Sequence, residues 1–331
     1  MHVGAGITGH VVEHSGYEHE ALLYAGHEDF LRHTVPFVRD AVASDEPILV
    51  VVGSEKLTAL HDELAGDAGG VLFEDMSVVG RNPARLIPLW QQFVADHSSS
   101  GRPLRGIGEP VWAGRSEAER SECDRHEALL NVAFDNPNFW LLCPYDITCL
   151  EAEVIDAARR NHPVLRGHHA GRRSPNFVGT SALAERAAEA LPDPPANAFT
   201  LEFGSGDLPK VRSAIRPATM GSGMSDARQT DLVTAVNEVA TNSIRHGGGG
   251  GRLRVWQEMD RVVCEVSDNG RIDDPLADRR LPVTRSGRGY GLWISNQLCD
   301  LVQLRTTARG TVVRLHKQVA APPEGATPAG S

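Results

Sequence analysis

Short apolar runs alternate with helical apolar periods over residues 20–162. The run from Pro47 to Val52 is unbroken and rich in β-branched residues, which is typical of a strand buried on both faces of a sheet. Apolar residues from Leu86 to Phe93 recur at the spacing i, i+3, i+4, i+7, so a helix is predicted over 83–96. Further elements are predicted as strands over 71–74, 104–111 and 139–142 and as a helix over 151–161. The alternation predicts an α/β domain.

The pattern changes after Pro163, which ends the last of these helices. Residues 168–175 are polar and typical of a loop, and residues 181–191 form a short Ala-rich segment that predicts a helix. The run Pro192-Asp-Pro-Pro195 then gives a stiff break. We therefore place a domain boundary in this region.

A second block of elements follows the boundary. Its longest helix is predicted to begin at Ser225 or Asp226, both good N-caps, and to end at His246 before five glycines that we interpret as a flexible turn. The other predicted elements are strands over 199–203, 253–255, 262–266, 301–307 and 311–316 and helices over 208–218 and 290–300. This order predicts an α+β domain with helices on one face of a mixed sheet.

Length and charge narrow the function classes. The chain has 331 residues, which favours two domains, and its net charge of −10 argues against direct nucleic-acid binding. No apolar run is long enough for a membrane helix and no secretory signal is evident, so we expect a cytoplasmic protein without a membrane partner. The five cysteines form no metal spacing. His10 and His14, four residues apart, are either two metal ligands or part of a loose polar terminus.

One candidate for chemistry lies on the long helix. Glu238 and Asn242 are four residues apart and share a face that is offset from the apolar stripe. A carboxylate beside a carboxamide suits a hydrated magnesium ion, which uses few protein oxygens. The alternative is an ordinary polar helix face.

Two further candidates follow along the chain. Asp268-Asn-Gly270 ends a strand, so it is either a simple turn or a site where the carboxylate accepts a hydrogen bond from an exocyclic amine and the glycine admits a flat base. Gly287-Arg-Gly-Tyr-Gly291-Leu292 enters a helix, where backbone amides and the helix N-terminus favour an anion. The polar residues 271–286 between them form a long loop, typical of a functional segment.

In this order the three signals resemble the N, G1 and G2 boxes of the ATP-binding fold shared by histidine kinases, gyrase-type ATPases and bacterial anti-sigma serine kinases. The stretch Ala235–Gly247 is most similar to the anti-sigma kinase version. The resemblance implies a GHKL-type, Bergerat two-layer sandwich in which Glu238 orients or deprotonates the nucleophile and Asn242 holds Mg²⁺. It also implies that Asp268 reads adenine, Gly270 borders the base, residues 271–286 form the ATP lid, and Thr311 places a hydroxyl near adenine. The remaining implied ATP-binding residues, whose glycines would wrap the phosphates, are Gly287, Arg288, Gly289, Tyr290, Gly291 and Leu292.

The first domain resembles the MEDS sensory domain of bacterial regulators. The matching stretches are His19–Tyr24, Gly108–Trp112, Leu142–Asp146 and His162-Pro163. The resemblance implies a RecA-like three-layer core, and no Walker A motif follows Val52, because Gly53-Ser-Glu-Lys56 lacks the glycine spacing. Residues near predicted strand ends either line a small-molecule pocket or merely cap strands and fill turns; they are Glu109, Cys143, Tyr145, Asp146 and His162.

Together the two resemblances imply a stress or developmental regulator. Residues 14–165 would be the sensory domain, 166–198 a linker, 199–317 the ATPase domain and 318–331 a disordered tail. A histidine kinase needs a phosphoacceptor histidine on a helical hairpin, and the segment between His162 and Phe199 is too short and proline-broken to form one. We interpret His168 and His169 in this segment as solvated residues. The implied activity is therefore that of an anti-sigma serine/threonine kinase. Its partners would be a sigma factor and a STAS-type antagonist. The sequence leaves the oligomeric state open, and the resemblance to anti-sigma kinases implies a homodimer. The alternatives are a non-catalytic nucleotide switch and a small-molecule sensor with a degenerate ATPase domain.

Overall fold

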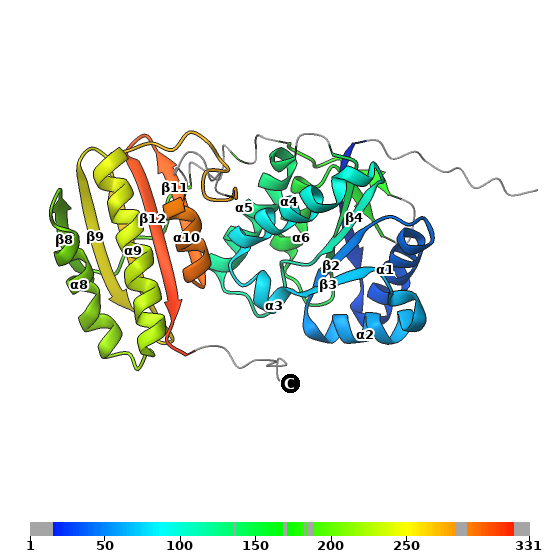
Figure 1. Ribbon diagram of the computed structural model, residues 1–331, viewed down its shortest axis with the longest axis horizontal. Helices are drawn as coiled ribbons and strands as arrows, with labels where there is room; N and C mark the ends of the chain where they lie inside the picture. Colours follow the sequence, from blue (N-terminus) through cyan, green and yellow to red (C-terminus); the bar gives the residue numbers. More distant parts are fainter. Residues whose placement is uncertain are drawn as a thin grey trace, which may run out of the picture.

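Two domains lie side by side in the computed structural model of the chain (Figure 1). The structure describes residues 16–134, 137–167, 171–179, 181, 183, 189–281 and 290–320. None of the helices in these ranges combines the length and apolar character that a bilayer span requires.

The first domain is built on a seven-stranded sheet of order β3-β2-β4-β5-β1-β6-β7. Its strands are β1 (Tyr17–Tyr24), β2 (Ile48–Val52), β3 (Val71–Asp75), β4 (Leu104–Gly108), β5 (Phe139–Asp146), β6 (Val164–Arg166) and β7 (Arg172–Arg173). The strands of this sheet pair in parallel, except that β6 and β7 are antiparallel. The main helices are α1 (Gly26–Ala43), α2 (Ser54–Leu64), α3 (Met76–Val79), α4 (Leu86–His97), α5 (Glu117–Ala133) and α6 (Ala152–Asn161).

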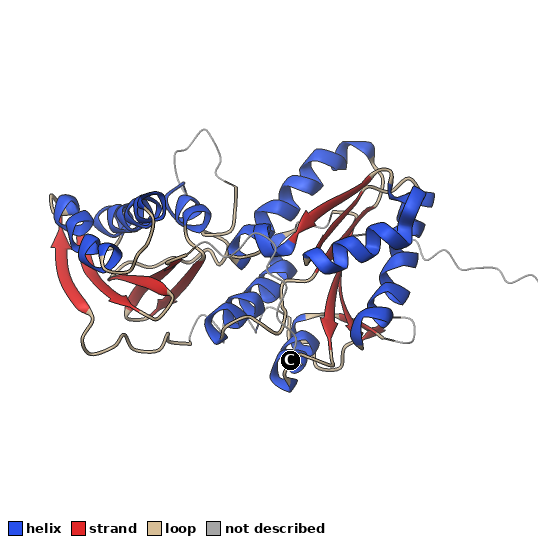
Figure 2. Ribbon diagram, turned by 90° about the horizontal axis from the view of Figure 1, so that it is seen from below, coloured by secondary structure: helices blue, strands red, loops and turns tan. Residues whose placement is uncertain are grey.

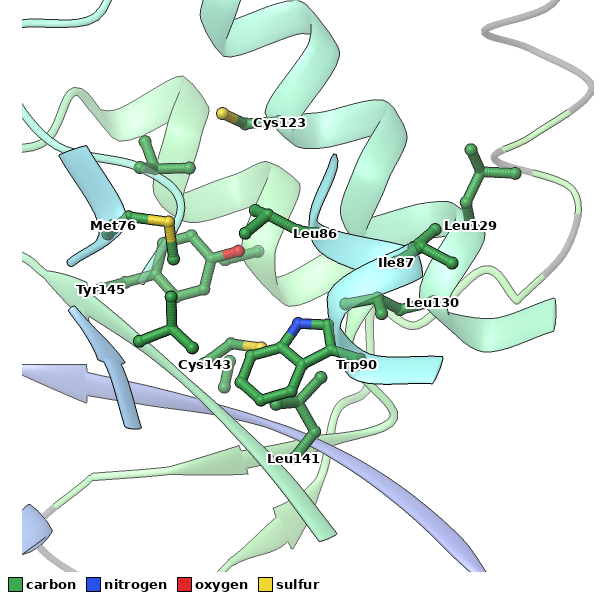
Figure 3. Close-up of a cluster of buried hydrophobic side chains, with 14 of the residues drawn as sticks. Met76, Leu86, Ile87, Trp90, Cys123, Leu129, Leu130, Leu141, Cys143 and Tyr145 are labelled. Atoms are coloured by element: carbon green, nitrogen blue, oxygen red, sulfur yellow. The ribbon is translucent and has the colours of Figure 1, made fainter. Parts of the chain in front are cut away.

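Helices cover both faces of this sheet, as the unbroken apolar strand predicts. Val51 of β2 belongs to a cluster with Trp90 of α4 and Leu129 of α5, whereas its neighbour Val50 packs with Phe30 of α1. Figure 3 shows the first of these clusters, in which Cys143 lies beside Trp90. The α/β prediction is therefore confirmed.

The second domain is a five-stranded antiparallel sheet of order β11-β12-β10-β9-β8. Its strands are β8 (Phe199–Gly204), β9 (Gly250–Gln257), β10 (Arg261–Asp268), β11 (Leu301–Thr307) and β12 (Gly310–Gln318), and its helices are α8 (Leu208–Met220), α9 (Asp226–His246) and α10 (Tyr290–Leu298). The helices lie on one face of the sheet (Figure 2). The expected α+β layering is confirmed, but the prediction of a mixed sheet was wrong.

The face of this sheet opposite the helices carries buried polar groups. Arg314 of β12 pairs with Glu265 of β10 at 2.5 Å and donates to the carbonyl of Pro192 in the segment that joins the domains. His316 is 5% exposed on the same strand and contacts Gln303 at 3.1 Å. Burial lowers the pKa of His316 to about 3, with help from nearby Arg314, so this imidazole is neutral in the folded protein.

Several predicted boundaries differ from the structure. The pattern failed to indicate β1, α1, α2 and α5, and Gly250 and Gly251 belong to β9 rather than to a flexible turn. Both glycines lie against the backbone of neighbouring strands. A Cβ added to Gly250 would stand 2.2 Å from the Phe203 carbonyl oxygen, and one added to Gly251 would stand 2.7 Å from the Ser267 carbonyl oxygen. The helix predicted over 181–191 lies largely outside the described residues, as do His168, His169, His10 and His14.

Candidate functional site

Asp268 is the centre of the candidate nucleotide site. It ends β10, where its Oδ2 accepts a hydrogen bond from the Ser243 hydroxyl of α9 at 2.6 Å and its Oδ1 accepts one from the Gly270 amide at 2.7 Å. A Cβ on Gly247 would stand 2.4 Å from the Asp268 Cγ, so only glycine fits where α9 ends. The carboxylate is therefore held in one orientation and keeps lone pairs for a ligand.

Thr311 lies beside this carboxylate on the neighbouring strand. The β10–β12 register pairs Asp268 with Thr311, whose hydroxyl donates to the Gly270 carbonyl at 2.9 Å. Gly310 precedes it with a φ of 122°, and a Cβ there would stand 1.9 Å from the Asp268 carbonyl oxygen. The structure thus brings Asp268, Gly270 and Thr311 together, as the resemblance implies.

Glu238 and Asn242 lie one turn apart on α9, facing the start of α10. A Cβ on Gly291 would approach the Asn242 Nδ2 to 2.8 Å and the Glu238 Oε2 to 3.4 Å. Within the described residues no hydrogen bond or ion pair occupies either side chain. Because hard oxygen donors are what Mg²⁺ prefers, the Asn242 side-chain oxygen fits a magnesium site beside a glycine cradle, and the Glu238 carboxylate lies next to it.

Part of the predicted phosphate loop lies beyond the described residues. Gly287, Arg288 and Gly289 fall in this undescribed part. Tyr290 begins α10, and Leu292 is 9% exposed in the core beneath it. The position of α10 is fixed by Ser295, which donates to the Ala235 carbonyl of α9 at 3.2 Å. The described parts of the three predicted boxes therefore meet around the same end of α9.

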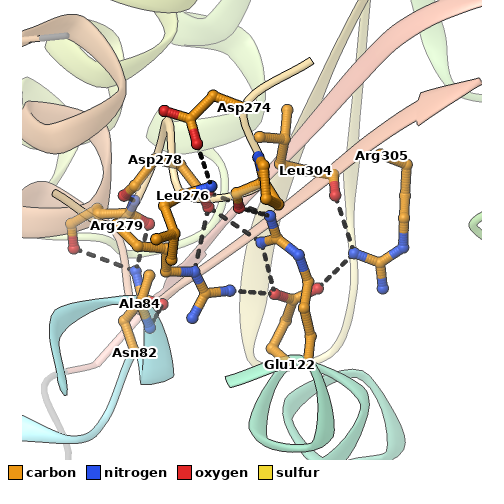
Figure 4. A network of polar contacts seen from close by, with 12 residues as sticks. Asn82, Ala84, Glu122, Asp274, Leu276, Asp278, Arg279, Leu304 and Arg305 are labelled. Atoms are coloured by element: carbon orange, nitrogen blue, oxygen red, sulfur yellow. Dashed lines mark hydrogen bonds and ion pairs between the residues drawn. The ribbon is translucent and has the colours of Figure 1, made fainter. Parts of the chain in front are cut away.

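The first half of the predicted lid contacts the first domain through a buried ionic network (Figure 4). Arg279 and Glu122 of α5 are both 0% exposed and pair at 2.7 Å, and the other Glu122 oxygen accepts from Arg305 of β11 at 2.6 Å. Arg125, one turn further along α5, donates twice to Asp278 at 3.1 Å. Although burial opposes ionisation, Arg125 and Arg279 hold the pKa of Asp278 at about 2.

Further contacts secure this interface. Leu276 is 2% exposed and packs within the hydrophobic core of the first domain. The Asn82 side chain donates to the Asn296 Oδ1 of α10 at 3.0 Å, and Arg85 donates to the backbone carbonyls at 296, 297 and 299. The interpretation of 271–286 as a long functional loop did not indicate that it docks on the first domain. The available signal was the apolar Leu276 in a highly charged stretch.

The residues expected to line a pocket in the first domain fall into two groups. Glu109 is buried and bonded to Lys56 at 2.6 Å and to the Tyr24 hydroxyl at 2.5 Å. Burial raises the pKa of Glu109, and the Lys56 ammonium opposes that rise. The amide of Gly26 donates to Asp146 at 3.2 Å near the same strand ends. In this group Glu109 is therefore engaged in an ion pair with Lys56, and Asp146 accepts hydrogen bonds from backbone amides.

The second group lies in the sheet interior near a separate pocket. Cys143 and His162 are 1% and 0% exposed, and the Tyr145 ring contacts His162 with a centroid distance of 5.5 Å. A pocket of about 390 Å³ opens beside Tyr145, with Glu127 and Asn161 also in its wall. The sequence missed Glu127 and treated His19 only as part of the resemblance.

These features define a chain that joins an α/β domain to a two-layer α+β domain with a candidate nucleotide site. Residues 18–163 match the family model described as the MEDS, MEthanogen/methylotroph, DcmR Sensory domain, and residues 204–317 match that of the histidine kinase-like ATPase domain. The chain therefore carries a MEDS sensory domain followed by a histidine kinase-like ATPase domain, as expected from the residues.

Among solved structures, the chain is similar to one described as the RsbU and RsbW domains of Rv1364c from Mycobacterium tuberculosis. The similarity has 19% identity and a TM-score of 0.29, and it covers 40% of this chain and 35% of that one. A likeness at this level supports no functional conclusion. A search of curated proteins found no matching relative.

Proposed function

We propose that the C-terminal domain binds ATP with Mg²⁺ and phosphorylates a serine or threonine of a STAS-type antagonist, while it also binds a sigma factor. The observation that carries the proposal is the placement of Asp268 against Ser243, Gly270 and Thr311, at the same end of α9 as Asn242. Asp268 would accept a hydrogen bond from the adenine amine. Asn242 would hold Mg²⁺, which when bound neutralises the phosphate charge.

The proposed reaction transfers the γ-phosphoryl group of ATP. The bond from the γ-phosphorus to the bridging oxygen breaks, a bond to the acceptor hydroxyl oxygen forms, and ADP leaves. Glu238 would orient that hydroxyl and accept its proton. Catalysis would otherwise depend on positioning by α10 and the glycine loop, since phosphoryl transfer needs little covalent chemistry from the protein.

Nucleotide titration of the purified chain tests the binding step. Asp268→Asn is expected to weaken ATP binding about 10- to 100-fold, the value of a hydrogen bond to a charged group. Asp260→Asn is the matched control, because the exposed Asp260 side chain precedes the other end of β10 and pairs with Arg261 at 2.8 Å. Absence of ATP binding at millimolar nucleotide would refute the proposal.

Labelled ATP and candidate antagonist proteins test the transfer step. Glu238→Ala should retain ATP affinity and lose transfer by about 100-fold or more, the usual contribution of a general base. Binding without any phosphoserine or phosphothreonine in the wild type would instead support a non-catalytic switch. The observation that favours this second candidate is the buried contact between the lid segment and α5. It couples the position of the lid to the sensory domain.

We further propose that this contact transmits the sensory signal. The segment 272–281 cannot leave the first domain without exposing Leu276 and separating Arg279 from Glu122. A signal that moves α5 would therefore change the position of the lid. The sensory module is proposed to act on nucleotide binding by this route.

A further inference from the structure

Four buried side chains from distant parts of the chain converge in the first domain. They are His19 of β1, Glu127 of α5, Cys143 of β5 and His162 after α6, and one ligand atom of each lies within 4.8 Å of all the others. Each is at most 1% exposed. The β1–β5 register pairs Cys143 with Ala21, so His19 and Cys143 point to the same face of the sheet, toward α5.

The two imidazoles are oriented by their outer nitrogens. The Nδ1 of His162 lies 2.8 Å from the Ala158 carbonyl, and the Nδ1 of His19 lies 3.2 Å from the Asn131 Oδ1. The Asn131 amide nitrogen donates to the Asn161 carbonyl, which fixes its oxygen toward His19. Each Nδ1 therefore carries the proton, and each Nε2 turns a lone pair inward.

Three of the inward atoms, the two imidazole Nε2 atoms and the Glu127 Oε2, are acceptors that face one another, and within the cluster only the Cys143 thiol offers a proton. The Nε2 atoms of His19 and His162 lie 3.0 Å and 3.2 Å from the Glu127 Oε2, and the His19 Nε2 lies 3.5 Å from the Cys143 Sγ. In the described residues the His162 Nε2 and the Glu127 Oε1 have no hydrogen-bond partner. Buried lone pairs in this arrangement repel one another unless positive charge lies between them.

The separations fit a metal ion at the centre. Zn–N bonds of about 2.0–2.1 Å and Zn–S bonds of about 2.3 Å place neighbouring tetrahedral ligands about 3.3–3.7 Å apart. The three observed separations of 3.0, 3.2 and 3.5 Å are close to these edges. A thiolate and a carboxylate together also balance a divalent charge, which a buried site requires.

We propose that His19, Glu127, Cys143 and His162 form a closed, four-ligand site for a divalent transition-metal ion of the zinc class. Binding releases the Cys143 thiol proton to solvent and forms the metal–thiolate bond. The pocket beside Tyr145 reaches one of the four ligands, because Glu127 forms part of its wall. Mixed nitrogen, sulfur and oxygen donors exclude Mg²⁺ and Ca²⁺ as the preferred occupants.

The test uses the purified, untagged full-length chain, stripped with a chelator and then loaded with Zn²⁺ or Co²⁺. After removal of excess metal we expect about one Zn²⁺ per chain by elemental analysis. The Co²⁺ form should show the strong visible bands of a tetrahedral site and a thiolate-to-cobalt charge-transfer band. Histidines elsewhere in the chain cannot produce that charge-transfer band, because it requires a sulfur ligand.

Variants then assign the sulfur. Cys143→Ser is expected to abolish the charge-transfer band and to weaken Zn²⁺ binding by more than about 100-fold, beyond the loss typical of a metal's outer partners. Cys149→Ser is the matched control, since Cys149 is an exposed thiol near the same strand, and it should change neither. Asn131→Ala should keep the band and lower affinity about 10- to 100-fold.

Three outcomes would overturn the site. One is a stripped chain that takes up no Zn²⁺, and another is stoichiometric uptake without a thiolate band in the Co²⁺ form. The third is a band that survives in Cys143→Ser. If that variant fails to fold, the wild-type Co²⁺ spectrum alone decides between the metal site and a hydrogen-bonded core cluster.

Discussion

Replacing Glu122 with glutamine probes how firmly the sensory domain holds the lid. The carboxylate is 0% exposed and accepts from Arg279 at 2.7 Å and from Arg305 at 2.6 Å. Glu122→Gln keeps the shape but leaves two buried guanidinium groups short of a counter-charge, and loss of one partner from a buried pair costs about 3–5 kcal/mol. Because Arg279 keeps Asp278 at 3.3 Å, we expect the lower end, about 3 kcal/mol.

This cost falls on the docking of the two domains. Hydrogen exchange measured by mass spectrometry should show residues 272–281 exchanging about 100-fold faster in the variant, which corresponds to about 3 kcal/mol. Glu117→Gln is the control, because Glu117 is exposed at the start of the same helix and should leave exchange unchanged. Equal protection of the segment in Glu122→Gln and wild type would show that the network does not hold the lid.

Three further changes test other parts of the structure. Gly310→Ala should lower the free energy of unfolding by at least about 2 kcal/mol more than Gly206→Ala, and it should weaken ATP binding. Both glycines have a positive φ, but of the two only a Cβ at 310 would collide with Asp268. Equal denaturation midpoints for the two variants would contradict this. Burial holds the pKa of His316 at about 3, below the value of about 6.5 in the unfolded chain. As the pH falls below about 6.5, the unfolded chain therefore gains a proton at this residue and the folded chain does not, so the folded state loses stability. His316→Gln should reduce that loss between pH 6.5 and 5 by about 2 kcal/mol in urea titrations, and an unchanged pH slope would show that the imidazole is not buried neutral. Leu276→Ala should cost about 2–5 kcal/mol and expose the lid to protease, whereas a cost below about 1 kcal/mol would place Leu276 outside the core.

The second domain was predictable because its signals are local. Ser225 caps α9 as expected, with its hydroxyl accepting from the Arg228 amide, and the Gly247 that follows His246 ends the helix. The boxes around Glu238 and Asp268 could be placed because each depends on adjacent residues. The contact of Gly247 with Asp268 could not be foreseen, since it depends on how α9 meets β10.

The first domain was less predictable because its buried groups are polar. Glu122 and Glu127 make α5 resemble a solvated, highly charged helix, although both are buried against partners remote in sequence. Pro36 inside α1 likewise weakens its helical pattern. Cys143 and His162 were singled out near predicted strand ends, but His19 and Glu127, which complete their cluster, come from 108 residues apart. The pattern of residues in a single sequence does not indicate contacts between residues so far apart in the chain.

One helix connects the two proposed sites. Glu127 of α5 faces the buried cluster, and Glu122 and Arg125 of the same helix hold the lid segment. Five residues separate Glu122 from Glu127, which places their side chains on different sides of the helix. A movement of α5 that accompanies metal binding would therefore also shift the lid. Because such coupling is reciprocal in free energy, any factor by which metal changes ATP affinity must equal the factor by which ATP changes metal affinity.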